Sequence, residues 1–168
     1  MDARKLGKTD IEVSPIGLGC WQFSQGNNMT GRMWSVLDQG TMDAVVDAAL
    51  NGGVTWFDTA QAYGNGASEQ ALGAALRHRG VEPGKVVVAT KWLPILKTAG
   101  NIPRTIGTRI ECLRPYPIDL FQVHIPWSVS SIPAQMREMA KLVRAGKVRA
   151  VGVSNFSASQ MARASEAL

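Results

Sequence analysis

The stretch KVVVATKW, residues 85–92, decides the fold class. Its residues 86–89 form a continuous run of valine and alanine. Continuous β-branched runs are typical of strands that are buried on both faces, as in a parallel sheet covered by helices. The stretch is therefore predicted to be a strand of a parallel sheet, and a charged residue, Lys91, stands near its end.

Outward from this strand, patterns typical of strands alternate with patterns typical of helices. The expected strands are residues 14–21, 54–59, 85–92, 118–126 and 148–156, and the expected helices are residues 41–53, 68–80, 102–114, 132–147 and 157–168. We expect Thr41 and Ser68 to cap the first two helices. Strict alternation of this kind predicts right-handed βαβ units and a parallel sheet.

Two architectures have such alternation, an open doubly wound sheet and a barrel. The first strand-to-helix junction, GLGCWQFSQGN, lacks the G-x-G-x-x-G spacing that seats a pyrophosphate on a helix N-terminus. Residues 4–13 are predicted to form a hairpin whose turn is residues 7–10. Such a hairpin is unusual before an open sheet but would close the bottom of a barrel, so the sequence favours a barrel.

The composition narrows the class of protein. The 168 residues are 45% hydrophobic, enough for one sizeable core, so we expect a single domain over residues 1–168. The net charge of +5 is spread along the chain, and we expect no nucleic-acid partner. No apolar run approaches the roughly 18 residues of a membrane span. With only Cys20 and Cys112, we expect buried free thiols, no metal site, no membrane partner and a cytoplasmic protein.

Polar or ionisable residues follow several of the predicted strands. They are Asp58, Lys91, His124, Ser154 and Asn155, with Tyr63 five residues beyond Asp58. Taken singly, each has an ordinary explanation, such as a turn cap, a solvated strand end or a satisfied core histidine. Parallel strands place their carboxyl ends on one face, and that face is where α/β proteins build their sites. Together these residues therefore predict a functional site.

This set of side chains suits proton donation to an oxygen that is becoming an alkoxide. A free phenol is too weak an acid at neutral pH, but a nearby ammonium group stabilises the phenolate. A carboxylate keeps the ammonium charged and in place, and an imidazole can orient a carbonyl oxygen. No cysteine or serine pairs with His124 in a nucleophile motif. Hydride delivery to a carbonyl is the natural partner reaction.

Successive motifs of the chain resemble those of the aldo-keto reductase family. They are SPIGLGCWQ, WFDTAQAYGNGASEQALGAAL, VVVATKW, IDLFQVHIPW and GKVRAVGVSNFS, in the family's order. The resemblance implies a (β/α)8 barrel of the TIM type that reduces carbonyl compounds with NADPH. It also implies that Asp58, Tyr63, Lys91 and His124 are the catalytic tetrad, with Tyr63 as the general acid.

The same resemblance implies residues for the cofactor and the substrate. Gly19, Cys20 and Trp21 match the loop beside the nicotinamide, together with Asp58, and Ser154 and Asn155 match the residues that hold the carboxamide. For the small-molecule carbonyl substrate we expect an apolar pocket. Its predicted aromatic lining is Trp21, Trp92 and Trp127, with Trp34 as a weaker candidate. Ordinary packing is the alternative explanation for each tryptophan.

The resemblance covers five of the family's eight strands, so the barrel is expected to be incomplete in this chain. In the family, later strands and loops bind the cofactor's phosphates, and the resemblance does not cover them. The first and fifth strands would also have unpaired edges. We therefore expect weak NADPH binding, and either self-association or a missing C-terminal half. The alternative function is a catalytically inactive module with a binding, assembly or regulatory role.

Overall fold

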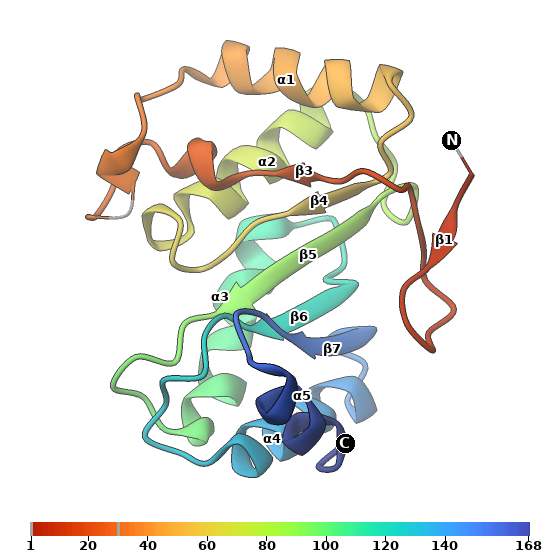
Figure 1. Ribbon diagram of the computed structural model, residues 1–168. Coiled ribbons are helices and arrows are strands. Elements are labelled where there is room, and N and C mark those ends of the chain that lie inside the picture. Colours follow the sequence, from red (N-terminus) through yellow and green to blue (C-terminus); the bar gives the residue numbers. More distant parts are fainter. Residues whose placement is uncertain (1, 30) are drawn as a thin grey trace.

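A five-stranded parallel sheet forms the centre of the computed structural model, which describes residues 2–29 and 31–168 (Figure 1). Its strands are β3 (Leu18–Gly19), β4 (Trp56–Asp58), β5 (Val87–Trp92), β6 (Leu120–Val123) and β7 (Ala150–Val153), and they lie side by side in chain order. The helices between and after them are α1 (Gln39–Asn51), α2 (Ala67–His78), α3 (Ile102–Leu113), α4 (Ile132–Arg144) and α5 (Ala158–Ser165). The predicted alternation of strands and helices is confirmed.

Short 3₁₀ helices occur in the connections, mostly beyond the carboxyl ends of the strands. They are η1 (Trp21–Ser24), η2 (Gly31–Met33), η3 (Gly64–Gly66) and η4 (Ala99–Asn101). In Figure 1 the strands run in one direction and the helices lie along one side of the curved sheet. This curved sheet with its helices is a partial (β/α)8 barrel, as predicted.

The predicted N-terminal hairpin is also confirmed. Strands β1 (Arg4–Lys5) and β2 (Glu12–Val13) are antiparallel. The hairpin lies near the amino ends of the sheet strands, at the opposite end from the strand-to-helix loops (Figure 1). Ile11 is 1% exposed and packs in a cluster with Val87 and Leu120, which belong to β5 and β6. The hairpin therefore covers the inner face of the sheet near the amino ends of its strands.

The two faces of the sheet bury different side chains. Along β5, Val88 and Trp92 belong to the large core between sheet and helices, whereas Val87 and Ala89 pack with the hairpin on the inner face. Successive side chains of a strand point to opposite faces. Lys91 is therefore on the inner face, two residues beyond Ala89, where the apolar hairpin contacts have ended.

Both predicted helix caps are wrong. The side chain of Asp38, not Thr41, caps α1, because its Oδ1 accepts a hydrogen bond from the Thr41 amide at 2.8 Å. Helix α2 begins after Gly66, whose φ is 97°, without a side-chain cap. Ser68 lies inside the first turn of α2 and is 0% exposed. Its hydroxyl serves long-range contacts that the local sequence pattern does not reveal.

No helix within residues 2–29 and 31–168 is long and apolar enough to cross a membrane.

Candidate active site

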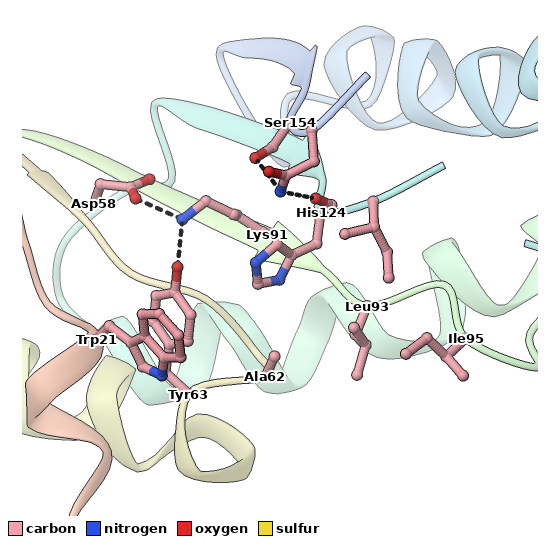
Figure 2. Close-up of a pocket in the computed structure, with 11 residues that line it drawn as sticks. Trp21, Asp58, Ala62, Tyr63, Lys91, Leu93, Ile95, His124 and Ser154 are labelled. Carbon is pink, nitrogen blue, oxygen red and sulfur yellow. Dashed lines mark hydrogen bonds and ion pairs between the residues drawn. The ribbon is translucent and has the colours of Figure 1, made fainter. Parts of the chain in front are cut away.

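Lys91 is the centre of a polar cluster at the carboxyl ends of β4 and β5 (Figure 2). Its Nζ donates hydrogen bonds to Asp58 Oδ2 at 2.5 Å and to the Thr59 carbonyl oxygen at 2.9 Å. It also lies 3.4 Å from the hydroxyl oxygen of Tyr63. The ammonium group is thus shared between a carboxylate and a phenol, and Lys91 is only 5% exposed.

The sheet register explains how residues 33 positions apart meet. Asp58 ends β4 and pairs with Ala89 of β5, so Lys91 stands two residues farther along the same face. After β4 the backbone continues alongside β5. The Thr59 amide donates to the Ala89 carbonyl, and the Gln61 amide donates to the Lys91 carbonyl. This backbone path delivers Tyr63 to the end of the Lys91 side chain.

Aromatic contacts hold the Tyr63 ring from two sides. The Trp21 ring is stacked on it, with centroids 5.6 Å apart and planes inclined by 17°. The imidazole of His124 meets it edge-on, at 5.5 Å and 85°. Trp34 in turn contacts Trp21 in a T-shaped arrangement at 5.6 Å. Few ring positions are compatible with these neighbours, so the direction of the phenol is restricted.

His124 follows β6 and is neutral at physiological pH. Burial, together with the positive charge of Lys91, lowers the pKa of His124 from 6.5 to about 4. Its backbone amide donates to the Trp92 carbonyl at 3.0 Å, which ties the residue to the neighbouring strand. Among the described residues, its Nδ1 has no hydrogen-bond partner. A neutral imidazole can donate one hydrogen bond to a substrate oxygen without adding charge.

Asp58 is partly buried, and two opposing effects act on it. Burial raises the pKa of Asp58 above its ordinary value, although the charge of Lys91 and the hydrogen bond from its Nζ act in the opposite direction. The ammonium group of Lys91, 2.5 Å from Asp58 Oδ2, favours the carboxylate form of Asp58. Asp58 is therefore the counter-ion that balances the buried charge of Lys91.

A cavity of about 550 Å³ opens beside this cluster. It is lined by Trp21, Asp58, Ala62, Tyr63, Lys91, Leu93, Ile95, His124, Ile125, Ser154 and Asn155. Figure 2 shows the polar groups on one side of the site and Leu93 and Ile95 on another. A small molecule bound here would meet the phenol, the ammonium group and the imidazole together. The volume is within the range of small-molecule sites.

Ser154 and Asn155 face the same cavity from the end of β7. Asn155 Nδ2 donates to the His124 carbonyl at 2.9 Å and lies 3.1 Å from Ser154 Oγ. Asn155 also has a positive φ of 60°, a conformation that asparagine adopts more readily than most residues. The Ser154 hydroxyl and the Asn155 amide can both donate and accept hydrogen bonds, so these two residues could hold a carboxamide group such as that of a nicotinamide.

The predicted tryptophan lining needs correction. Trp21 lines the cavity, but Trp92 is fully buried on the helix side of β5, where its Nε1 donates to Asn101 Oδ1 at 2.9 Å. The strand alternation that turns Lys91 inward turns Trp92 outward. Trp127 is 71% exposed and does not line this cavity. Trp34 does not line the cavity, but its ring contacts that of Trp21, which does.

Some of the residues that were predicted to contact a cofactor line the cavity and others do not. Gly19 and Cys20 are not among the residues that line it. Cys20 is fully buried and its amide donates to the Asp58 carbonyl at 2.8 Å, so it supports the site from behind. The sequence interpretation missed Leu93 and Ile95, although their position directly after β5 was a signal that they stand on the same rim.

A parallel sheet with an ionisable cluster at its carboxyl ends defines a barrel-type α/β protein with an enzyme-like site. The chain belongs to the aldo/keto reductase family, because residues 15–168 match the profile of that family. An aldo-keto reductase of Bacillus subtilis is 37% identical over an alignment of 169 positions, which covers 96% of this chain and 49% of that protein. The chain thus spans about half the length of the curated relatives that it matches.

Solved structures agree with this family. The glycerol dehydrogenase of Gluconobacter oxydans has a TM-score of 0.81 at 32% identity, over 99% of this chain and 52% of that one. An aldo-keto reductase of Klebsiella pneumoniae in complex with NADPH has a TM-score of 0.73 at 27% identity, over 90% of this chain and 49% of that one. These relatives are named as reductases, oxidoreductases and dehydrogenases, so the comparisons do not favour a non-catalytic module.

Proposed function

We propose that this chain supplies the proton-donating site of an NADPH-dependent carbonyl reductase. The observation that carries the proposal is the contact of Lys91 Nζ with both Asp58 and Tyr63 at the wall of one cavity. Membership of the aldo/keto reductase family supports oxidoreductase chemistry. The substrate that binds in the cavity would be an aldehyde or a ketone, with its carbonyl oxygen directed toward the Tyr63 hydroxyl.

In this mechanism Tyr63 is the general acid. The carbonyl oxygen of the substrate accepts the phenol proton as its carbon accepts a hydride, and the product is an alcohol. Lys91 stabilises the phenolate that remains, because its ammonium group is 3.4 Å from the phenol oxygen. Asp58 balances the charge of Lys91 before and after the transfer, so the buried site never holds an isolated ammonium ion.

His124 orients the substrate. Its neutral imidazole stands edge-on to the Tyr63 ring and donates a hydrogen bond to the same carbonyl oxygen. Two donors that converge on one oxygen define the position of the carbonyl and stabilise the charge that develops there. Leu93, Ile95 and Trp21 would contact the apolar remainder of the substrate.

NADPH, when bound, supplies the hydride. Ser154 and Asn155 would hold its carboxamide, and the Trp21 segment would lie beside the nicotinamide. The Klebsiella pneumoniae relative in complex with NADPH supports the choice of this cofactor. Since these contacts reach the nicotinamide end alone, we propose that the 168-residue chain by itself holds NADPH weakly, with a dissociation constant above about 1 μM.

The edges of the sheet bear on assembly. Strands β3 and β7 each have a sheet partner on one side only within the described residues. We propose that further barrel strands cover these edges, either from a longer form of the chain or from a second copy. We also propose that the 168 residues are one domain. A cytoplasmic location would suit the free thiols of Cys20 and Cys112, although Cys112 is partly exposed rather than buried.

The test is reduction of simple aldehydes, followed by the loss of NADPH absorbance, with the 168-residue chain and with a form extended to the length of its relatives. We expect activity in the extended form, and a preference for NADPH over NADH. Fluorescence titration measures cofactor binding separately from turnover. If the extended form binds the cofactor but reduces none of a broad set of aldehydes and ketones, the proposed function is wrong.

A further inference from the structure

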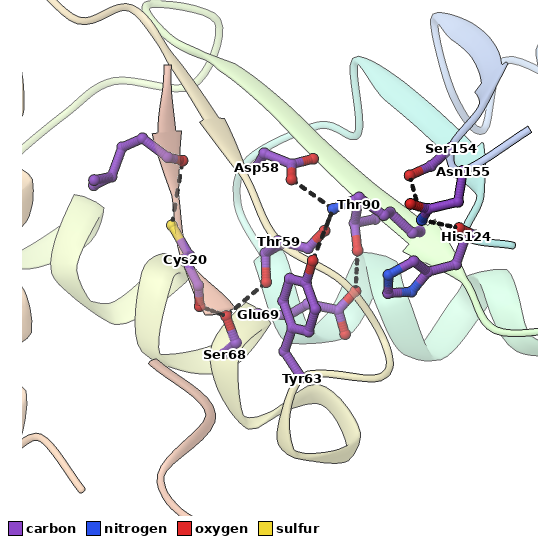
Figure 3. Close-up of polar contacts among 12 residues, drawn as sticks. Cys20, Asp58, Thr59, Tyr63, Ser68, Glu69, Thr90, His124, Ser154 and Asn155 are labelled. Atoms are coloured by element: carbon purple, nitrogen blue, oxygen red, sulfur yellow. Dashed lines mark hydrogen bonds and ion pairs between the residues drawn. The ribbon is translucent and has the colours of Figure 1, made fainter. Parts of the chain in front are cut away.

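The first turn of α2 contains two buried polar side chains that the proposed proton transfer does not use. Ser68 and Glu69 are both 0% exposed, and neither lines the cavity in the described part of the chain. We call these two residues the α2 anchor. Figure 3 shows that they reach from α2 toward different strands on either side of Tyr63.

Ser68 joins α2 to the ends of β3 and β4. Its Oγ donates to the Cys20 carbonyl at 2.5 Å and lies 2.7 Å from Thr59 Oγ1. Cys20 directly precedes Trp21, whose ring stacks on Tyr63. Thr59 directly follows Asp58, and its carbonyl accepts a hydrogen bond from Lys91. The Ser68 hydroxyl thus contacts the residue before Trp21 and the residue after Asp58.

Glu69 joins α2 to β5 and α3. Its Oε1 accepts a hydrogen bond from Thr90 Oγ1 at 2.6 Å, and its Oε2 lies 3.1 Å from Arg109 Nε. Thr90 directly precedes Lys91 in β5. Arg109 is 4% exposed, and one nitrogen of its guanidinium group lies 3.3 Å from the position that a Cβ on Gly66 would occupy.

The segment between Tyr63 and the anchor is rich in glycine. Gly64 and Gly66 have φ values of 66° and 97°. A Cβ at Gly64 would lie 2.2 Å from the Ser24 carbonyl oxygen, so the close approach of the two backbones requires glycine there. Glycine leaves a loop with more conformational freedom than other residues do. The loop after Tyr63 therefore depends on contacts at its far end for a single conformation.

A direct hydrogen bond connects the anchor with Tyr63. The Ser68 amide donates to the Tyr63 carbonyl at 3.2 Å. A shift of the first turn of α2 would therefore move the backbone of Tyr63. Burying an ion pair adds little to stability in general, because desolvation offsets the attraction, so the Glu69–Arg109 pair is better explained by the geometry it specifies.

We propose that Ser68 and Glu69 are positioning residues that hold the Tyr63 phenol between Trp21 and Lys91. Ser68 sets the position of the loop relative to β3 and β4, and Glu69 sets it relative to β5. The effect on reduction rests on the proposed function, whereas the effect on the position of the loop does not.

Hydrogen exchange followed by mass spectrometry tests the position of the loop without any assay of activity. The variants are Glu69→Gln, which keeps the shape but removes the charge facing Arg109, and Thr90→Val, which removes the hydroxyl donor to Glu69. We expect exchange in peptides that cover residues 59–68 to be about tenfold faster, with α4 unchanged. Glu111→Gln is the matched control, because it breaks an exposed ion pair with Arg114.

The results of this experiment separate positioning from general stability. Exchange that is faster throughout the chain, or unchanged in residues 59–68, would overturn the proposal. If Glu69→Gln does not fold, Thr90→Val decides alone, since it keeps the ion pair of Glu69 with Arg109.

Kinetics of the extended form add a second test. A misplaced general acid should lower kcat by about tenfold or more while KM and NADPH affinity change by less than about twofold. In a Tyr63→Phe background, Glu69→Gln should have no further effect on kcat. A full further loss in that background would show that Glu69 does not act through Tyr63. If the parent reduces no carbonyl compound, the proposed function fails and the exchange experiment still decides the positioning role.

Discussion

Lys91 Nζ lies 2.5 Å from Asp58 Oδ2, at the end of two neighbouring parallel strands. The same ammonium group is 3.4 Å from the Tyr63 hydroxyl, which comes from the loop between them. In the proposed mechanism, this cation stabilises the negative charge that forms on the phenol oxygen when its proton moves to the substrate. This relationship leads to predictions for each member of the cluster.

Replacement of Tyr63 by phenylalanine should remove the general acid. We expect kcat for carbonyl reduction by the extended form to fall by roughly 10²–10⁴-fold. NADPH affinity, measured by fluorescence titration, should change little, because the hydroxyl acts on the substrate oxygen. Tyr116→Phe is the matched control, since the Tyr116 hydroxyl bonds to the Val81 carbonyl outside the site. Turnover of Tyr63→Phe close to that of the parent would disprove the assignment.

Lys91→Met should be as damaging to kcat and should also destabilise the fold. The variant leaves the Asp58 carboxylate in a partly buried position without its cation, at a cost of about 1–3 kcal/mol in the free energy of unfolding. Chemical denaturation measures this loss. Adding Asp58→Asn should restore much of the stability but none of the activity. If the double variant regains activity, the charge of Lys91 is not required.

The imidazole of His124 should remain neutral over the physiological pH range. A folded-state pKa of about 4 lies below the ordinary value of 6.5, because burial and Lys91 disfavour the charged form. The contribution of His124 to stability is therefore present above pH 6.5 and is lost as the pH falls toward 4. Since the chain has two histidines, a His78→Gln variant leaves a single imidazole for NMR titration. A midpoint above about pH 6 would contradict the prediction.

Glu69 should make stability depend on pH in the opposite sense. Burial raises the pKa of Glu69 from 4.5 to about 7, although Arg109, Thr90 and Lys91 oppose the shift. The folded state then binds the proton more tightly than the unfolded state, so stability decreases as the pH rises from about 4.5 to about 7. The difference in unfolding free energy between the parent and Glu69→Gln should therefore fall across this range. The His124 contribution cancels in that comparison, and a constant difference would refute the shift.

Sedimentation velocity tests the coverage of the sheet edges. The 168-residue chain should self-associate at low micromolar concentration, because β3 and β7 have unpaired edges among the described residues. The groove beside β7, between the hairpin and α5, has a volume of about 620 Å³ and offers apolar side chains such as Val151 and Met161. A compact monomer that unfolds cooperatively would show that these edges need no partner.

Much of the fold could be predicted because its signals are local. The run at residues 86–89 indicates a buried strand without knowledge of its neighbours. The predicted strand, residues 85–92, agrees closely with β5 at Val87–Trp92. Helix caps were less predictable. Thr41 and Ser68 both resemble N-caps, but Asp38 caps α1, and Ser68 bonds with Cys20 and Thr59 across long stretches of chain.

By itself, the sequence determined the alternation of strands and helices and the polar residue types at the strand ends, since both depend on local periodicity and on the parallel direction of the strands. Only the tertiary structure decided which neighbouring side chain faces the site. Lys91 points to the inner face and Trp92 to the helices, because adjacent residues of a strand diverge and the sheet register selects the face. Tertiary contacts alone also place Glu69 against Thr90 and Arg109, because a buried carboxylate finds its partners in space rather than at a fixed spacing along the chain.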